Sequence, residues 1–162
     1  MKELFTAAEI ATIVTNLAVN LNHDYVNKKP IIIGVLNGSF IFLADLIRKL
    51  NFENQVDFCQ VRSYKDNERG QIEFLKKWDS NLFQKDIIIV DDIVDSAKTV
   101  EFLKEQLEKC GPASIKVCSL LVRKNSINNA DYYGFTVDDE FVYGYGLDNA
   151  QYSRGLSNIY KI

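Results

Sequence analysis

The chain has 162 residues, of which 47% are hydrophobic and 25% are charged, and this composition predicts one soluble domain with a sizeable core. Its formal net charge of −3 argues against a nucleic acid partner, because phosphate backbones are bound by basic surfaces. The N-terminus lacks the apolar core of a signal peptide, and no apolar run approaches the ~18 residues of a membrane span, so we expect a cytoplasmic protein without a membrane partner.

The first predicted element is a helix over about residues 6–23. Thr6 and Glu9 have the spacing of a capping box, in which each side chain accepts a hydrogen bond from the other residue's backbone. Apolar residues then recur at helical spacing, at Ile10, Ile13, Val14, Leu17, Ala18 and Leu21. The pattern predicts an amphipathic helix with one face in the core.

A strand and a second helix follow. Residues 30–36 are almost all apolar, which is typical of a strand buried on both faces. The strand ends in Asn37, Gly38 and Ser39, and residues 40–50, beginning with Phe40, have apolar side chains at helical spacing. An Asn–Gly pair is weak evidence for function on its own, because it is also common in tight turns.

The next part of the chain consists of two strand-like segments with a polar, highly charged segment between them. Residues 56–64 alternate as a strand, and residues 72–78 resume a strand-like pattern. Between them, residues 65–71 are polar and highly charged. We expect this segment to be either a solvated hairpin or a lid that moves over a site.

The central stretch combines a strand, carboxylates and a helix start. Residues 87–90 are consecutive apolar residues, which predict a strand buried on both faces. The strand runs into Asp91 and Asp92, where we expect an acidic turn, and Ser96 is the expected N-cap of a helix over residues 97–110. Ligands of open α/β sheets usually bind at such a strand end, so we expect the site here.

The C-terminal third continues the alternation. A Gly–Pro pair at residues 111–112 predicts the helix end, and residues 114–122 read as another buried strand. Residues 132–137 and 141–146 read as shorter aromatic strands. Strands alternating with helices predict an α/β fold with a mostly parallel sheet and right-handed crossovers.

Cysteine and histidine usage excludes several kinds of chemistry. Cys59 and Cys118 lie in apolar runs, where a cysteine is usually a small buried hydrophobe, and Cys110 is far from both in the sequence. No CxxC or clustered Cys/His spacing is present. His23 is the only histidine, so the sequence offers neither a histidine-based triad nor a histidine-rich metal site.

The chemistry of the central stretch points to a phosphorylated sugar. Carboxylates at a strand end can bind a Mg²⁺ complex, directly or through water, or accept hydrogen bonds from sugar hydroxyls. Residues 95–99 offer successive backbone N–H groups, hydroxyls and a helix N-terminus, which together make an anion cradle. A nucleotide-binding module and a response-regulator-like acidic pocket are the alternatives. A P-loop is disfavoured because GxxxxGK[ST] is absent.

Residues 88–99 resemble the phosphoribosyl-pyrophosphate (PRPP) motif of type I phosphoribosyltransferases. Further segments resemble the purine branch of that family, the hypoxanthine–guanine phosphoribosyltransferases, in the same order along the chain: residues 35–40, 63–64, 120–124 and 139–148. The resemblance implies a single domain over residues 1–162 with the type I phosphoribosyltransferase fold, in which a central, mostly parallel sheet is flanked by helices. The N-terminal helix and about residues 125–162 would form a small purine-binding hood.

The resemblance also implies a pentosyltransferase activity, in which the phosphoribosyl group of PRPP moves to N9 of hypoxanthine or guanine and pyrophosphate leaves. Asp91 and Asp92 would bind the ribose hydroxyls, and Asp95 would be the general base or acid that faces purine N7. The 5′-phosphate would be wrapped by Ser96, Ala97, Lys98 and Thr99.

The remaining roles concern pyrophosphate, purine and metal. Asn37, Gly38 and Arg154 would contact pyrophosphate, in a family whose turn after this strand often carries a non-proline cis peptide. Phe141 would stack on the purine, and Val142 would read it through its backbone. Mg²⁺ is the implied cofactor, and its candidate ligands, direct or through water, are Asp91, Asp92 and Asp148.

Asp148 would also contribute to binding on the purine and pyrophosphate side. Ser63 and Tyr64 would begin a mobile lid over about residues 63–78. Arg123 or Lys124 would reach the purine carbonyl O6.

Four positions depart from the family pattern. Asp91 is commonly Glu, Asn37 is commonly Lys, and Arg123 is commonly Lys. Ala97 is commonly Gly, and its Cβ is harmless only if its φ is negative. A xanthine-preferring enzyme and a non-catalytic PRPP or nucleotide sensor are therefore kept as alternatives. The family implies a homodimer or homotetramer, and the aromatic surface near residues 132–145 would suit an interface.

Overall fold

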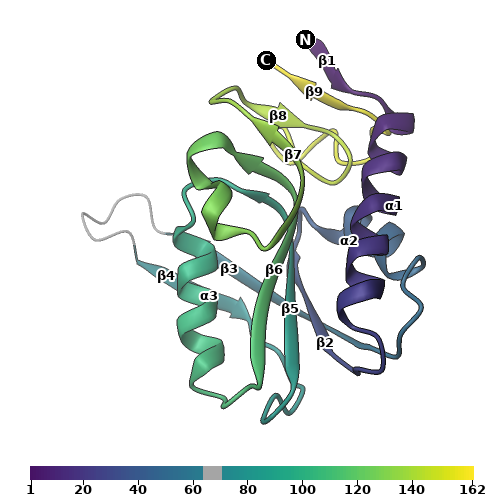
Figure 1. Cartoon of the computed structure of the whole chain (residues 1–162). Helices are drawn as coiled ribbons and strands as arrows, with labels where there is room; N and C mark the ends of the chain where they lie inside the picture. Colours follow the sequence, from purple (N-terminus) through teal and green to yellow (C-terminus); the bar gives the residue numbers. More distant parts are fainter. Residues whose placement is uncertain (64–70) are drawn as a thin grey trace.

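The computed structural model describes residues 1–63 and 71–162. Its main sheet has six strands in the order β4-β3-β2-β5-β6-β7. Their bounds are β2 (Ile31–Leu36), β3 (Gln55–Ser63), β4 (Ile72–Lys76), β5 (Asp86–Val94), β6 (Ser114–Arg123) and β7 (Tyr132–Val137). Neighbouring strands are parallel, except that β4 is antiparallel to β3. The prediction of a mostly parallel sheet is confirmed (Figure 1).

Helices cover both faces of this sheet. Helices α1 (Ala7–Asp24) and α2 (Phe40–Ile47) lie on one face, and α3 (Lys98–Glu108) lies on the other (Figure 1). Successive residues of a strand point to opposite faces. Accordingly, Ile88 and Val90 of β5 pack in the core cluster of α1 and α2, whereas Ile87 and Ile89 pack in that of α3. The apolar run at the centre of the sequence is therefore a strand buried on both sides.

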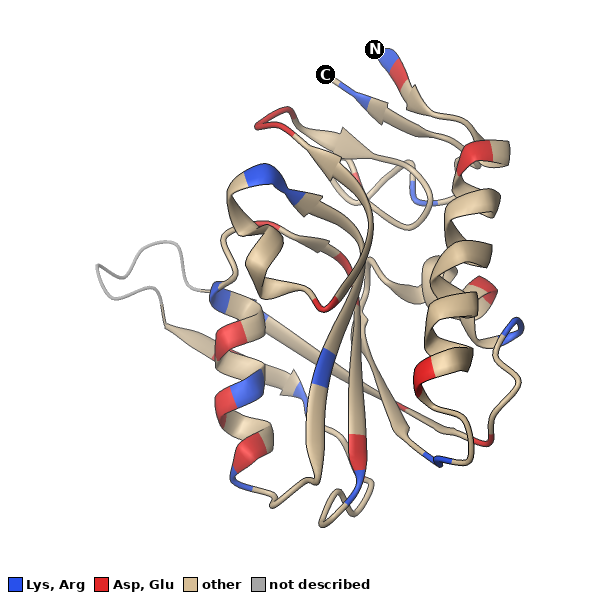
Figure 2. Cartoon of the chain, viewed as in Figure 1, with Lys and Arg blue, Asp and Glu red and all other residues tan. Residues whose placement is uncertain are grey.

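Helix α1 begins as its sequence predicts. The Thr6 side chain accepts a hydrogen bond from the Glu9 N–H at 3.1 Å, and the Thr6 N–H donates to Glu9 Oε2 at 2.8 Å. The capping box is thereby confirmed. Helix α3 is also amphipathic, because its buried stripe, Val100, Leu103 and Leu107, faces the sheet while Lys and Glu residues are interspersed along it (Figure 2). No helix among the described residues is long and apolar enough to cross a membrane.

A second, smaller sheet joins the two ends of the chain. Its order is β1-β9-β8, with β1 (Lys2–Phe5), β9 (Ile159–Lys161) and β8 (Val142–Tyr143), and both pairings are antiparallel. The two termini therefore lie side by side (Figure 1). A 3₁₀ helix, η1 (Lys124–Asn129), connects β6 to β7.

Two predicted elements are shorter than expected. The strand predicted over residues 141–146 is reduced to β8, because Gly144, Tyr145 and Gly146 have φ angles of 98°, 52° and 99°, which end an extended chain. The helix predicted to reach residue 50 ends at Ile47. The helical spacing of residues 40–50 places Phe40 on the apolar face, but Phe40 is exposed, and the buried residues of α2 are Phe42, Leu43 and Leu46.

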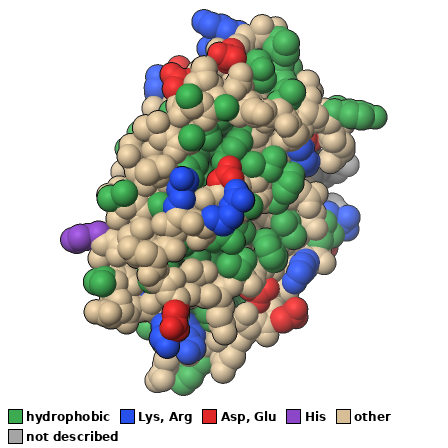
Figure 3. All heavy atoms as spheres, turned by 90° about the vertical axis from the view of Figure 1, so that its right-hand side faces the viewer, with side chains coloured by type: hydrophobic (Ala, Val, Ile, Leu, Met, Phe, Trp, Pro, Cys, Tyr) green, Lys and Arg blue, Asp and Glu red, His purple; other side chains and the backbone are tan. Residues whose placement is uncertain are grey.

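Tyr145 connects the loop after β8 with helix α2. Its hydroxyl donates a hydrogen bond to Asp45, and a cavity of about 350 Å³ opens beside it, between α1 and α2. Figure 3 shows this side of the molecule, where hydrophobic side chains surround a small group of charged ones. The loop is thus anchored on α2.

The three cysteines are free thiols. Cys59 and Cys118 are buried, as predicted, and burial raises the pKa of both thiols to about 12. Cys110, at the end of α3, is partly exposed. We expect a disulfide reagent at pH 8 to modify Cys110 rapidly, and to modify Cys59 and Cys118 only after unfolding in guanidinium. Rapid modification of all three thiols in the native protein would contradict this packing.

Candidate active site

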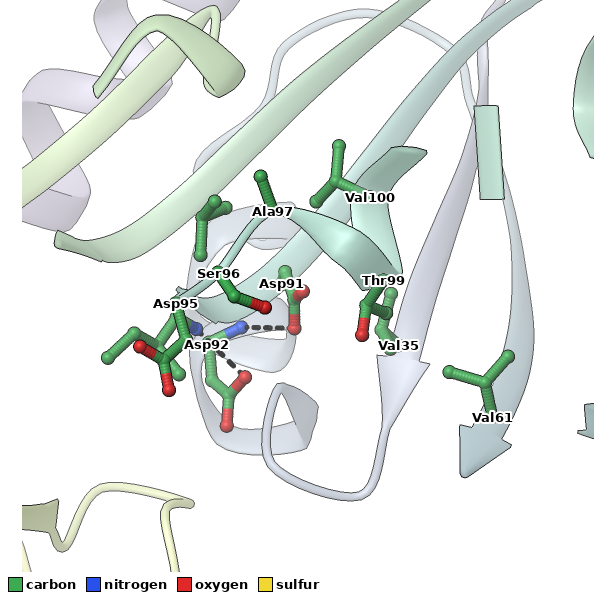
Figure 4. Close-up of a pocket in the computed structure, with 11 residues that line it drawn as sticks. Val35, Val61, Asp91, Asp92, Asp95, Ser96, Ala97, Thr99 and Val100 are labelled. Carbon is green, nitrogen blue, oxygen red and sulfur yellow. Dashed lines mark hydrogen bonds between the residues drawn. The ribbon is translucent and has the colours of Figure 1, made fainter. Parts of the chain in front are cut away.

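The carboxyl end of β5 and the start of α3 enclose a hollow of about 210 Å³ (Figure 4). It is lined by Val35, Val61, Asp91, Asp92, Ile93, Val94, Asp95, Ser96, Ala97, Thr99 and Val100. The structure therefore brings together most of the residues predicted to bind the ribose phosphate. Lys98 is the one member of that set that does not line the hollow.

The two adjacent aspartates lie inside β5, and the predicted acidic turn is wrong. The ladder between β5 and β6 continues through Asp91 to Val94, so the carboxylates are carried by the sheet itself. Asp91 Oδ1 accepts a hydrogen bond from the Asp92 N–H at 2.9 Å, and Asp92 Oδ1 accepts one from the Ile93 N–H at 2.8 Å. Both side chains are thus held close to the end of the strand.

Asp91 is the more buried of the pair, with an exposed fraction of 6%. Burial raises the pKa of its carboxyl well above the usual range, and the neighbouring charge of Asp92 raises it further. A cation or several hydroxyl donors at this place would stabilise the ionised form. The pair therefore suits a ligand that carries hydroxyls and a divalent cation.

The metal prediction is supported only in part by this geometry. Among the described residues, no three or more His, Cys, Asp and Glu side chains converge, so Asp148 does not complete a three-ligand cluster with Asp91 and Asp92. Mg²⁺ commonly takes one or two protein carboxylates and fills its remaining positions with water and substrate phosphate. The Asp91–Asp92 pair fits that mode of binding.

The bend between β5 and α3 carries the residues predicted to cradle a phosphate. Helix α3 begins at Lys98 with Ala97 as its N-cap, so the prediction of Ser96 as the N-cap is wrong. The Ser96 and Thr99 side chains line the hollow beside the first turn of the helix, whose free N–H groups favour an anion (Figure 4).

Ala97 adopts a left-handed conformation with φ of 66°, so the negative φ that would make its Cβ harmless is not observed. The left-handed conformation destabilises an L-residue by roughly 1–2 kcal/mol, whereas it destabilises glycine little. Glycine also makes the unfolded chain more flexible, which offsets part of this gain. We therefore expect Ala97→Gly to raise the free energy of unfolding by about 0.5–1 kcal/mol. Urea denaturation measures this change.

Ala44→Gly is the matched control, because Ala44 is exposed within helix α2. It should lower the free energy of unfolding by about 1 kcal/mol. If Ala97→Gly destabilises the protein as much as Ala44→Gly does, the left-handed conformation at Ala97 is refuted.

The turn after β2 lies directly against this hollow. The Leu36–Asn37 peptide bond is cis, as the family resemblance implies. A Cβ built on Gly38 would lie 1.8 Å from Asp92 Oδ2, and a Cβ built on Gly146 would lie 2.4 Å from the Gly38 carbonyl oxygen. The turn, the end of β5 and the loop after β8 therefore meet, and the predicted pyrophosphate contacts adjoin the ribose contacts.

Arg154 and Asp148 lie together in the loop after β8. Arg154 Nη1 donates a hydrogen bond to the Gly146 carbonyl at 2.7 Å, and Arg154 Nη2 is 3.6 Å from Asp148 Oδ1. Asp148 Oδ2 accepts the Gln151 N–H at 2.8 Å. Because Gly146 touches Gly38, this guanidinium is fixed to the segment that borders the pyrophosphate turn.

Arg123 connects Asp95 to the predicted purine-binding segment. Its Nε donates to Asp95 Oδ1 at 3.0 Å, and its Nη1 donates to the Glu140 carbonyl at 2.8 Å and to the Asp138 carbonyl. The Arg123 side chain is 12% exposed, whereas that of Asp95 is 70% exposed. Lys124 instead pairs with Asp138 at 2.6 Å, and this hydrogen bond raises the pKa of the lysine.

Phe141 and Val142 follow the carbonyls that Arg123 holds. The Phe141 ring is 49% exposed and lies 6.4 Å from the Tyr143 ring, and Val142 is buried. The Phe141 carbonyl accepts the Ile162 N–H at 3.0 Å, and β8 pairs with β9. The segment thus presents a half-exposed aromatic ring from a fixed backbone.

The predicted lid lies partly outside the described residues. Ser63 ends β3 and pairs with Ile72 of β4, and Tyr64 belongs to the segment that the structure does not describe. Farther along, Trp78 is buried and its ring lies 5.3 Å from that of Phe74. The lid over residues 63–78 stays a prediction.

Sequence reasoning missed two residues of the site. Gly146 is one of them. It has a positive φ and lies close to the Gly38 carbonyl, and both features favour glycine. Ser126 is the other: it is buried, and its hydroxyl donates to the Asp95 carbonyl at 2.6 Å. No local signal marks a serine in a polar stretch as a partner of a residue in another element.

A parallel strand that ends in paired carboxylates beside a helix N-terminus is typical of α/β proteins that bind phosphorylated, hydroxyl-bearing ligands. Residues 1–150 match the family model described as the phosphoribosyl transferase domain. The chain belongs to the phosphoribosyltransferase family, and within it to the hypoxanthine–guanine branch.

Named relatives support this placement over more than nine tenths of their length. The chain is 35% identical to the hypoxanthine phosphoribosyltransferase of Buchnera aphidicola, covering 100% of this chain and 96% of the relative. It is 38% identical to the hypoxanthine-guanine phosphoribosyltransferase of Bacillus subtilis, covering 98% and 91%. A crystal structure of a hypoxanthine-guanine phosphoribosyltransferase from Bacillus anthracis superposes with a TM-score of 0.95 at 34% identity, covering 100% and 98%.

Proposed function

We propose that this protein is a purine salvage enzyme that transfers the 5-phosphoribosyl group from PRPP to N9 of hypoxanthine, guanine or both, giving IMP or GMP and pyrophosphate. The carrying observation is the position of Asp95. Asp95 lines the hollow together with Ser96, Ala97 and Thr99, and its carboxylate accepts a hydrogen bond from Arg123, which also donates to the Glu140 carbonyl just before Phe141. A proton-transfer group between sugar and base is what this reaction requires.

Each contact has a physical reason. Asp91 and Asp92 accept hydrogen bonds from the ribose hydroxyls, and the bend of Ser96, Ala97 and Thr99 holds the 5′-phosphate at the start of α3. Lys98, on the same turn, adds positive charge near the phosphate. Cleavage of the ribose–pyrophosphate bond develops oxocarbenium character on the sugar, and fixed carboxylates beside it favour that charge.

The leaving group is held on the other side. Asn37 and Gly38 offer backbone and amide donors to pyrophosphate, and Arg154 offers a cation that is already ordered by Gly146. Mg²⁺ bound near Asp91, Asp92 or Asp148 would neutralise the charge that grows on the pyrophosphate oxygens. Because the nucleophile is the nitrogen of the base, the buried cysteines need no part in the reaction.

The purine lies against Phe141, with the Val142 backbone at its edge. Arg123 is the better candidate for the O6 contact, because Lys124 is paired outward with Asp138. Among the described residues, Arg123 Nη2 is the nitrogen of that guanidinium without a hydrogen-bond partner. It would donate to a purine carbonyl but would meet another donor in a 6-amino group.

Equal concentrations of hypoxanthine, guanine and xanthine, supplied with PRPP and Mg²⁺, test the base preference. IMP and GMP should form in excess over XMP when the nucleotides are separated by chromatography. Predominant XMP would replace the proposal with the xanthine-preferring alternative. If no nucleotide forms from any of the three bases, the proposed function is refuted.

We further propose a cytoplasmic homo-oligomer, either a dimer or a tetramer. Free thiols fit a reducing compartment, and an exposed aromatic side chain of the predicted surface near residues 132–145, that of Tyr133, suits an interface. The hood and the lid are likewise proposed as functional divisions of one domain. Size-exclusion chromatography with light scattering decides the oligomeric state, and a monomeric mass at micromolar concentration would contradict it.

A further inference from the structure

Ser126 is a buried polar residue that none of the roles above uses. It lies in η1, directly after β6, and is 5% exposed. Its Oγ donates a hydrogen bond to the Asp95 carbonyl oxygen at 2.6 Å. This bond joins η1 to the bend that carries both the proton-transfer group and the phosphate cradle.

The Asp95 carbonyl needs such a partner because regular pairing has ended there. The β5–β6 ladder stops at Val94 and Val122, and α3 begins only at Lys98. In the bend between them, the Ala97 carbonyl accepts the Glu101 N–H at 2.9 Å, whereas Asp95 and Ser96 belong to neither a strand nor a helix. At Asp95, one residue beyond the last ladder pair, the hydroxyl of Ser126 donates the hydrogen bond that a continued ladder would otherwise supply.

Fixing this carbonyl has a consequence for the next residue. In a trans peptide the carbonyl and the following N–H point in opposite directions. A carbonyl held towards η1 therefore turns the Ser96 N–H away from η1 and keeps it there. Arg123 holds the carboxylate of the same Asp95 at 3.0 Å, so the stretch from Arg123 to Ser126 fixes both the side chain and the main chain of that residue.

We propose that Ser126 is a positioning residue, whose hydroxyl aligns the Asp95 carboxylate and the phosphate cradle by fixing the main chain between them. The inference rests on the proposed transferase function. It predicts that loss of the hydroxyl impairs PRPP binding and turnover together, while the purine segment beyond Arg123 is spared.

Ser126→Ala tests this directly, with Ser119→Ala as its matched control. Ser119 is also buried in this region of the sheet, and its Oγ also donates to a backbone carbonyl, that of Leu121, at 2.6 Å. Both variants lose one buried hydrogen bond, so both should lose a similar amount of thermal stability. We expect Ser126→Ala alone to lower kcat and raise the KM for PRPP, each by about 3- to 10-fold, as loss of one hydrogen bond allows.

The KM for hypoxanthine should stay within about twofold, and Ser126→Thr, which keeps the hydroxyl, should recover most of kcat. Unchanged kcat and PRPP KM in Ser126→Ala, or equal kinetic losses in Ser119→Ala, would overturn the inference. If Ser126→Ala does not fold, Ser126→Cys, of similar size but a weaker donor, is judged by the same criteria.

Failure of the proposed function is distinguishable from failure of this inference. A wild-type protein without turnover refutes the transferase function. The inference is then judged by calorimetric titration with PRPP alone, in which Ser126→Ala should bind about 3- to 10-fold more weakly than Ser119→Ala. Equal affinities of the two variants would overturn it.

Discussion

Asp95→Asn should lower kcat by roughly 10²- to 10⁴-fold, because an amide cannot exchange a proton with the purine nitrogen in the transition state. The substitution keeps the size of the side chain and leaves an oxygen to accept the Arg123 Nε–H. The phosphate cradle and the Ser126 bond to the main chain are also retained. Steady-state rates with saturating PRPP and hypoxanthine measure the effect.

Asp138→Asn is the matched control for this experiment. Asp138 is also an exposed carboxylate near the site, and it pairs with Lys124 at 2.6 Å, outside the hollow. Exposed ion pairs contribute little, so kcat should change by less than about twofold. A loss below about tenfold in Asp95→Asn would remove Asp95 from the proton-transfer role.

Gly38→Ala should lower kcat/KM by roughly 10²-fold or more, because misplacement of reacting groups by about 1 Å has an effect of that size. The added Cβ would lie 1.8 Å from Asp92 Oδ2 and 2.7 Å from Asp92 Cγ, so either the turn or the carboxylate must move. Both are assigned to PRPP, one to its pyrophosphate and one to its ribose. PRPP affinity should therefore fall with turnover.

Gly155→Ala is the control, because a Cβ at Gly155 would meet nothing within 4 Å. Its kinetics and PRPP affinity should match those of the wild type, although it lies next to Arg154 in the sequence. If Gly38→Ala keeps the wild-type affinity for PRPP, the turn after β2 does not border the substrate in the way described.

Local patterns in the sequence predict the main sheet and its helices well. The apolar run before Asp91 predicts a strand buried on both faces, and Thr6 with Glu9 predicts the start of α1, because both signals depend on neighbours in the chain. The small sheet was not predictable in this way. Strand β9 pairs with β1 across almost the whole chain, and its few residues carry no periodicity of their own.

In the site, likewise, features that depend on neighbouring residues were predicted, and features that depend on distant contacts were not. The aspartates and the residues predicted to cradle a phosphate are contiguous in sequence, so residues 88–99 predict their grouping, and all of them except Lys98 line one hollow. The conformation of Ala97 was not predicted, because its φ of 66° depends on how the chain turns from the end of β5 into the start of α3. The contacts of Arg123 and Ser126 with Asp95 depend on the pairing of β5 with β6, which brings the two strand ends together.

The transferase function is tested most directly by chromatographic detection of the nucleotide that the purified protein forms from PRPP and hypoxanthine in the presence of Mg²⁺. We expect IMP and pyrophosphate in equal amounts, with formation abolished when PRPP is omitted and strongly reduced in Asp95→Asn. Calorimetric binding of PRPP without nucleotide formation from hypoxanthine, guanine or xanthine would contradict it and would identify a sensor on the same fold.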